Sequence, residues 1–413
     1  MKASTLQKHL KGYKDYFLGF AAVGALGVAY FGVPLLIPLS YDSPIGVAEE
    51  SERAADRPPL VAHVKTPEAV KAIYMSQCVV GTPTFRDSLV TLIEETELNA
   101  VVIDIKDYTG RIAFPSDNPA LKDSVSDACG ASDMQDFVKR LHEKGVYVIG
   151  RITVFQDPYY TKAHPELAVH RASDGSVWKD YKGLSFVDVG ARPFGDYIVT
   201  LSKEAYALGF DELNYDYIRF PSDGNMKDIY FSHSNGISKA EALEKFFGHL
   251  YSELKPIGVV LSADLFGMTA TNNDDLNIGQ VLERALPYFD YVAPMVYPSH
   301  YPSGFNGWKN PNDHVYDVVR FSMDRAAART IATTTSVAGY AQTRIGTSTP
   351  AMYEKPAYDK LKMRPWLQDF DYGGDYDAAD VRAQIQATYD AGLNSWMLWS
   401  PSNKYTRGAL FDE

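Results

Sequence analysis

The sequence predicts an α/β fold, a (β/α)8 barrel of the TIM type preceded by a single N-terminal transmembrane helix and a disordered stalk. Strand-like segments rich in Val, Ile and Tyr recur eight times, and helical patterns of ten or more residues separate them. Strands joined through helices pair in parallel, and eight such units close into a barrel. A long uncharged run near the N-terminus predicts the membrane helix.

Residues 1–16 form a basic tail, and residues 17–39 form an uncharged stretch that can cross the roughly 30 Å hydrocarbon core of a membrane as a helix. Lysines precede this stretch and acidic residues follow it, which places the N-terminus in the cytoplasm and the barrel outside. We therefore expect a single-pass protein of the cell membrane. The alternative is a cleaved signal peptide, although the stretch exceeds the usual apolar length of about 7 to 15 residues.

Residues 40–67 combine acidic residues, Ser and Ala with four prolines, a composition that cannot bury a core. We expect an extended extracytoplasmic linker there, followed by a barrel domain over residues 68–413. The eight barrel strands are expected at residues 70–76, 100–107, 146–155, 213–221, 259–267, 291–298, 361–369 and 394–401.

Residues 330–358 do not fit the repeat, and we expect them to be an insertion before the seventh strand. The alternative is that residues 331–340 form a barrel strand themselves. Three helix starts carry reciprocal capping signals. These signals are Ser132 with Gln135, Ser238 with Glu241, and the weaker pair Asp377 with Asp380.

The composition excludes some functions. A formal net charge of −12 argues against nucleic acid as a partner, because its binding needs a basic surface. The nine histidines form no paired metal-ligand motif, so neither a metal nor a cofactor is expected. Cys78 and Cys129 follow the first and second strands, which are neighbours in a barrel. An oxidising compartment permits a disulfide between them, and two free thiols are the alternative.

Two long loops follow strands at the expected mouth of the barrel, over residues 108–131 and 156–190. The second carries Trp178 and several tyrosines, and Trp399 lies at the end of the last strand. Aromatic rings there provide flat faces for sugar rings, and an aromatic content of 13% suits a saccharide cleft. The alternative is that these rings only pack the fold.

Aspartates at or near predicted strand ends, where barrel enzymes place their function, are Asp107, Asp216, Asp264 and Asp369. Glycoside cleavage needs one carboxyl group to protonate the leaving oxygen and another as nucleophile or base, about 5 to 9.5 Å apart. Asp216 and Asp264 end adjacent strands, which can supply that spacing. The alternative is that Asp216 is a structural ion-pair partner of Arg219 or Arg151.

An ordered set of polar and aromatic stretches, among them Asp216-Tyr-Ile-Arg219-Phe-Pro221, runs through the barrel domain. The set covers residues 99–107, 110–111, 155–158, 164–166, 178–180, 188, 209–212, 216–221, 262–264, 294–298, 364–370 and 396–400. In these stretches the chain, from about residue 71 to 405, resembles a bacterial family described as a putative glycosyl hydrolase domain, which occurs in anchored or secreted proteins.

The resemblance implies a TIM barrel related to glycoside hydrolases. By analogy with the alpha-amylase superfamily, it makes Asp216 the nucleophile, Asp264 the acid/base and Asp369 the transition-state stabiliser. That superfamily has Glu, one methylene longer, in place of Asp264. The residues expected to bind sugar are Asp104, Lys106, Asp107, Arg151, Trp178, Arg219, Tyr297, Gln368 and Trp399. For Lys106, a salt bridge to Asp104 is the alternative.

These observations together predict a membrane-anchored glycoside hydrolase that acts outside the cytoplasm on a cell-envelope or extracellular polysaccharide. The alternative is a non-catalytic carbohydrate-binding barrel tethered to the cell surface. The two differ in their acids, because hydrolysis needs one protonated and one ionised carboxyl group at the working pH, whereas binding needs neither.

Overall fold

The computed structural model describes residues 62–337 and 343–412, and in them eight parallel strands close into a barrel in the order β1-β11-β10-β6-β5-β4-β3-β2. The predicted (β/α)8 architecture is confirmed. The barrel strands are β1 (Lys71–Met75), β2 (Ala100–Lys106), β3 (Tyr147–Thr153), β4 (Glu212–Asp216), β5 (Val260–Phe266), β6 (Tyr291–Met295), β10 (Trp366–Gln368) and β11 (Trp396–Trp399).

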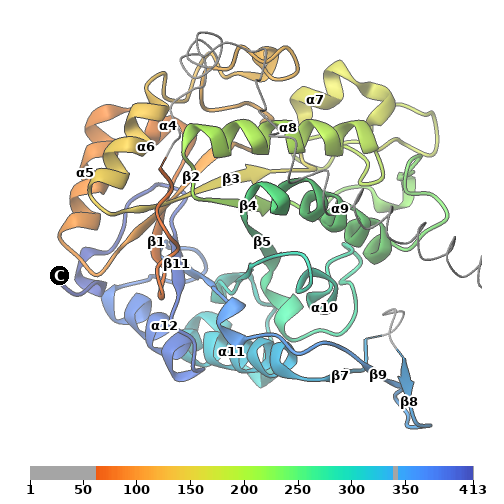
Figure 1. Cartoon of the computed structure of the whole chain (residues 1–413). Coiled ribbons are helices and arrows are strands. Elements are labelled where there is room, and N and C mark those ends of the chain that lie inside the picture. Colours follow the sequence, from red (N-terminus) through yellow and green to blue (C-terminus); the bar gives the residue numbers. More distant parts are fainter. Residues whose placement is uncertain (1–61, 338–342, 413) are drawn as a thin grey trace, which may run out of the picture. The chain divides into compact units, whose positions relative to one another are not determined.

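Helices surround the ring of strands, as Figure 1 shows. They are α4 (Gln77–Val80), α5 (Pro83–Glu94), α6 (Met134–Glu143), α7 (Pro158–Ala163), α8 (Arg192–Leu208), α9 (Lys239–Leu254), α10 (Leu282–Ala285), α11 (Val315–Ile331) and α12 (Ala378–Asp390). Gly209 ends α8 with a left-handed φ of 115°, a conformation that glycine adopts without a Cβ clash, and the chain turns there into β4.

Between α11 and β10 the chain leaves the barrel, as expected for the insertion. Strands β7 (Thr334–Thr335), β8 (Arg344–Ile345) and β9 (Met352–Glu354) form a separate antiparallel sheet in the order β7-β9-β8, beyond the end of α11 in Figure 1. The alternative that residues 331–340 contain a barrel strand is therefore wrong for the described part of that segment. Thr334 and Thr335 pair with β9 rather than with a barrel strand.

The capping signals had mixed outcomes. Asp377 and Asp380 form a complete capping box, and the Ser238 hydroxyl accepts a hydrogen bond from the Glu241 backbone amide. The prediction for Ser132 is wrong, because α6 begins after Asp133 and has no side-chain cap. The Asp133 carboxylate instead accepts a 2.9 Å hydrogen bond from Arg86.

The hydrophobic core has an inner and an outer layer, because successive strand residues point to opposite faces. In β1, Ala72 and Tyr74 belong to the cluster inside the barrel, with Trp366 from β10. Ile73 and Met75 belong to the larger cluster that includes the buried faces of the helices. Polar side chains on the inner face therefore lie in a closed, dry environment unless they reach the mouth.

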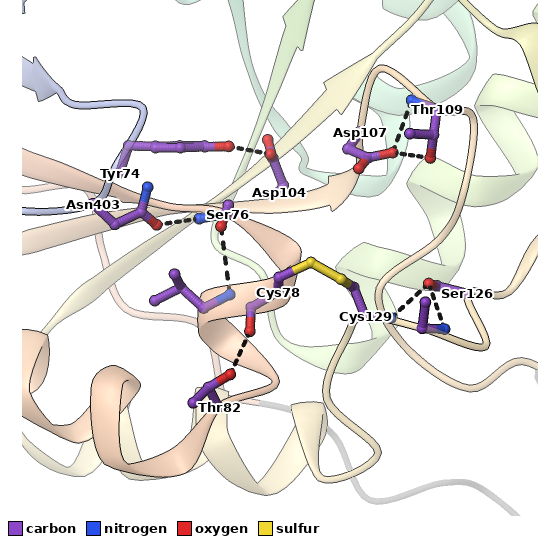
Figure 2. The surroundings of a disulfide bond; sticks show 12 residues. Tyr74, Ser76, Cys78, Thr82, Asp104, Asp107, Thr109, Ser126, Cys129 and Asn403 are labelled. Atoms are coloured by element: carbon purple, nitrogen blue, oxygen red, sulfur yellow. Dashed lines mark hydrogen bonds between the residues drawn. A yellow bond between two sulfur atoms is a disulfide. The ribbon is translucent and has the colours of Figure 1, made fainter.

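A disulfide joins Cys78 in α4 to Cys129 in the loop after β2, with Cα atoms 4.5 Å apart (Figure 2). This confirms the prediction that the two cysteines approach each other, and the alternative of two free thiols is wrong. The bond ties the loops that follow two neighbouring strands.

Part of the expected linker lies against the end of the barrel where the strands begin. The backbone amide of Val64 donates a 2.7 Å hydrogen bond to Asp211, which immediately precedes β4, and His142 contacts the same carboxylate at 2.9 Å. The His63 ring stacks on Tyr206 with centroids 4.0 Å apart. The predicted membrane span, residues 17–39, lies outside the described residues, and no helix in the described part is long and apolar enough to cross a membrane.

Candidate active site

Polar residues from four neighbouring strands face one another inside the barrel. Asp104, Arg151, Asn214 and Ser262 are register partners across β2, β3, β4 and β5. Asp216 and Asp264 lie two residues further along β4 and β5, so their side chains share the inner face but sit closer to the mouth. The parallel register thus brings two of the three predicted catalytic aspartates together.

The Arg151 guanidinium lies among three carboxylates. Its Nη1 donates to Asp104 at 2.5 Å, its Nη2 donates to Asp216, and its Nε lies 3.7 Å from Asp264. Tyr74 and Trp399 flank it, with ring centroids 5.7 and 5.1 Å from the guanidinium carbon. Asp216 is therefore ion-paired with Arg151, one of the two partners that the structural alternative named. Arg219 instead donates to the Phe220 carbonyl and the Ser222 hydroxyl.

Asp264 has two unlike oxygens. Its Oδ1 accepts hydrogen bonds from Trp366 Nε1 at 2.7 Å and from Asn214 at 2.9 Å. Its Oδ2 is buried and has no hydrogen-bond partner among the described residues. Burial, followed by repulsion from the Asp216 carboxylate, raises the pKa of Asp264 well above its ordinary value. A proton on Oδ2 relieves both costs, so Asp264 is suited to be a proton donor.

Asp216 has a different environment. Besides its ion pair with Arg151, its Oδ1 accepts a 2.5 Å hydrogen bond from the backbone amide of Tyr217. Both interactions place an N–H donor on an Asp216 oxygen. Asp216 and Asp264 therefore line one cavity with unlike hydrogen-bond partners.

Asp104 is the third carboxylate at Arg151. The Tyr74 hydroxyl donates to it, as Figure 2 shows, and burial raises its pKa to about 6 although Arg151 opposes the shift. Asp104 has both oxygens engaged by protein groups, and the residues that line the pocket at the barrel mouth do not include it. We assign it to the support of Arg151.

A cavity of about 240 Å³ opens above these residues. Six predicted site residues line it: Arg151, Asp216, Arg219, Asp264, Tyr297 and Trp399. Five further residues line the cavity but were not predicted as site residues from the sequence: Tyr217, Phe266, Met295, His300 and Trp366. Trp366 could have been found because it lies in the stretch 364–370 that carries the family resemblance.

The remaining predicted residues lie outside this cavity. Lys106, expected to bind sugar, is fully buried and contacts Asp157 at 2.9 Å, so its salt bridge is with a residue of the next loop and not with Asp104, the alternative partner. Asp107 accepts from Thr109 at 2.9 Å.

Trp178 and Gln368 are also engaged elsewhere. Trp178 is 1% exposed, packs with Phe186, and donates from Nε1 to the Asn225 carbonyl at 3.1 Å, which leaves no face for a sugar. Gln368 accepts a 2.8 Å hydrogen bond from the Ser299 hydroxyl.

Asp369, the third predicted catalytic residue, also lies outside the cavity. Its two oxygens accept from the backbone amide and the hydroxyl of Thr406, at 2.9 and 2.6 Å. Burial raises its pKa. In this structure its carboxylate joins the segment after β11 to β10.

The sequence profile of a family described as "Putative glycosyl hydrolase domain" matches residues 72–405. No curated protein is significantly similar to the chain. A hypothetical protein from Ruminiclostridium thermocellum ATCC 27405 is 32% identical over 50% of this chain and 98% of its own, with a TM-score of 0.43.

Two glycoside hydrolases of known structure share the barrel fold. The glycoside hydrolase domain of PgaB (BpsB) from Bordetella bronchiseptica is 13% identical, with a TM-score of 0.56 over 84% of this chain and 99% of its own. Alpha-L-fucosidase isoenzyme 2 from Paenibacillus thiaminolyticus is 12% identical, with a TM-score of 0.52 over 83% of this chain and 47% of its own. At these identities the likeness concerns the fold alone.

Proposed function

Because the chain belongs to the putative glycosyl hydrolase domain family, we propose that it cleaves glycosidic bonds, with Asp264 as general acid and Asp216 as nucleophile. The observation that carries the proposal is the unlike pair of carboxyl groups at one cavity. Asp264 is buried with a raised pKa and an oxygen that has no hydrogen-bond partner among the described residues, and Asp216 is ion-paired with Arg151.

The chemistry follows from these two environments. Asp264 gives its proton to the leaving glycosidic oxygen while an Asp216 oxygen attacks the anomeric carbon, which forms a glycosyl-enzyme and breaks the glycosidic bond. Asp264, now a carboxylate, then accepts a proton from the water that attacks the anomeric carbon and releases Asp216. Arg151 orients Asp216 and stabilises its negative charge before the attack and after the release from the sugar.

The walls of the cavity suit a sugar ring. Tyr297 and Trp399 line it together with the acids, and the Trp399 ring is held by stacking on Tyr74 with centroids 4.1 Å apart. A positioned aromatic face offers contact area to the apolar face of a pyranose at a small entropic cost. The proposed substrate is a polysaccharide of the cell envelope or the extracellular space, in keeping with the predicted membrane anchor at residues 17–39.

A non-catalytic carbohydrate-binding barrel is the second candidate. The observation that favours it is that both oxygens of Asp216 already have partners, Arg151 and the Tyr217 amide. A residue built only to hold Arg151 would have the same contacts. Binding without turnover is what this candidate predicts.

The test is a reducing-sugar assay of the unit Val61–Glu413 against a polysaccharide panel, with the Asp264→Asn variant as comparison. We expect release of reducing ends by the native unit and a loss of about 10²- to 10⁴-fold in the variant, the usual size of a general-acid contribution. With an activated aryl glycoside as substrate, the Asp264→Asn variant should lose less activity than with a polysaccharide, because the aryl leaving group needs less protonation. Binding of a polysaccharide with no reducing ends released by either protein would establish the binding barrel instead.

A further inference from the structure

A second cavity of about 400 Å³ adjoins the first, and Tyr217 and Arg219 line both. Its other walls come from the loops that follow β2, β3 and β4, including Tyr108, Gln156 and Asp223. The first cavity alone is smaller than the roughly 300 to 1,000 Å³ of typical ligand pockets. With the second cavity, the space at the mouth extends from the acids toward the long loop after β3.

Tyr217, which lines both cavities, has an unusual backbone conformation. Its φ of 51° lies in the left-handed region, which is uncommon for a residue with a bulky side chain. This conformation ends β4 at Asp216, earlier than the sequence pattern predicted, and directs the Tyr217 amide to the Asp216 carboxylate at 2.5 Å. Such backbone strain persists when the surroundings enforce it, and it concentrates at binding and catalytic sites. The same residue therefore fixes Asp216 and forms the wall between the two cavities.

Gln156 gives the second cavity a polar recognition group. The residue is 5% exposed, and no hydrogen bond joins its side-chain amide to another described residue. Its amide atoms are not among the fully buried polar atoms that lack a partner, so they reach the surface of the cavity, where water or a ligand can satisfy them. A sugar hydroxyl fits this amide well because it both donates and accepts.

Aromatic and charged groups define the ligand further. The Tyr108 ring is 54% exposed, and the Arg219 guanidinium carbon lies 5.2 Å from the Tyr217 ring centroid. Two basic residues, Lys182 and Arg219, and two acidic residues, Asp180 and Asp223, line the cavity, so the formal charges balance. This balance favours an uncharged sugar over a uronate polymer.

We propose that the second cavity is a sugar-binding subsite that holds an uncharged hexose or N-acetylhexosamine unit next to the unit at Asp216 and Asp264. The inference rests on the proposed function, since it takes the first cavity to hold a sugar. It predicts that the protein binds an extended stretch of polysaccharide across Tyr217 and Arg219, with Gln156 and Tyr108 contacting a unit remote from the scissile bond.

The test measures binding rather than turnover. The full-length chain, solubilised in detergent and carrying Asp264→Asn to prevent cleavage, is titrated with malto-, cello- and chito-oligosaccharides of increasing length. We expect one series to bind with an affinity that rises when the chain is long enough to enter the second cavity. Gln156→Ala and Tyr108→Ala should each lower the affinity for the long ligands by about tenfold, a change of about 1.4 kcal/mol in binding free energy. The affinity for the shortest ligand should stay the same.

Tyr251→Ala is the matched control for Tyr108→Ala. Tyr251 is 43% exposed on α9 and lines neither cavity, so this variant should keep the full length dependence. If no oligosaccharide binds at any length, the proposed function itself fails. If short and long ligands bind equally, or if the Gln156 and Tyr108 variants keep the gain with length, the subsite is refuted while the catalytic pocket stands. Tyr108 is exposed, so its variant gives an answer even if Gln156→Ala does not fold.

Discussion

Replacing Asp216 with Asn distinguishes a nucleophile from a structural ion-pair partner. The substitution keeps the volume of the side chain and removes its charge. If Asp216 is the nucleophile, turnover should fall by about 10⁴-fold or more, the usual loss when a nucleophile or its partner is removed. Repulsion from Asp216 helps to raise the pKa of Asp264, so the same change should also lower that pKa.

The effect on stability can be estimated from the contacts of Arg151. Removing one partner of a buried ion pair costs about 3–5 kcal/mol when it leaves a lone charge. Arg151 would keep its 2.5 Å bond to Asp104 and would still have Asp264 within 3.7 Å. We therefore expect a smaller loss of about 1–3 kcal/mol, the cost of a hydrogen bond to a charged group. For a domain of this size that lowers the melting temperature by about 1–4 °C.

Glu212→Gln is the matched control, because it breaks another buried carboxylate–arginine pair on the same strand, at the opposite end. Both oxygens of Glu212 accept from Arg364, at 2.9 and 3.0 Å, and Arg364 has no other carboxylate partner among the described residues. This variant should lose about 3–5 kcal/mol of stability and keep its activity per folded molecule.

The assay measures reducing ends per folded molecule at low temperature and, separately, the melting temperature of each variant. Asp216 is not the nucleophile if Asp216→Asn melts much earlier yet keeps most of its activity, and its role is then structural. The same conclusion follows if Glu212→Gln loses activity to the same degree, because the loss at Asp216 would then reflect damage to the fold.

Three further predictions concern pH, the disulfide and the membrane. Since the pKa of Asp264 is raised, its protonated form persists to higher pH, and kcat/KM should fall as the pH rises through that pKa; a profile that stays flat on the alkaline side would contradict its role as acid. Cys78→Ser should lower stability by about 2–4 kcal/mol, and thiol labelling of denatured, unreduced native protein should find no free thiol. Full-length protein should fractionate with membranes, and deletion of residues 1–58 should release a soluble body; full-length protein found soluble with a new N-terminus after residue 39 would show a cleaved signal instead.

The fold could be predicted because its signals are local. Each strand carries its own apolar pattern, and the helices between them fix parallel pairing, so the barrel order followed without any long-range information. The seventh strand was predicted too long. Pro365, which has no amide proton to donate, immediately precedes β10, and the ladder there is limited to Trp366–Gln368.

The site was only partly predictable, because its partners come from distant loops. Strand ends placed Asp216 and Asp264 correctly, since parallel register carries over from one strand to the next. The sequence could not show that Lys106 would pair with Asp157, because that contact depends on how the loop after β3 folds back. Trp178 was expected at the mouth because it lies in the loop after β3. The path of that loop could not be predicted from the sequence either, and the folded loop encloses the Trp178 side chain.

The segment that precedes β1 is attached to the barrel at the end opposite the mouth. Val64 and Thr66 bind Asp211 and Tyr147 at the end of the barrel where the strands begin, opposite the acids. A truncation that ends before residue 62 should therefore keep these contacts, whereas a truncation past residue 66 removes them at the end of the barrel away from Asp216 and Asp264.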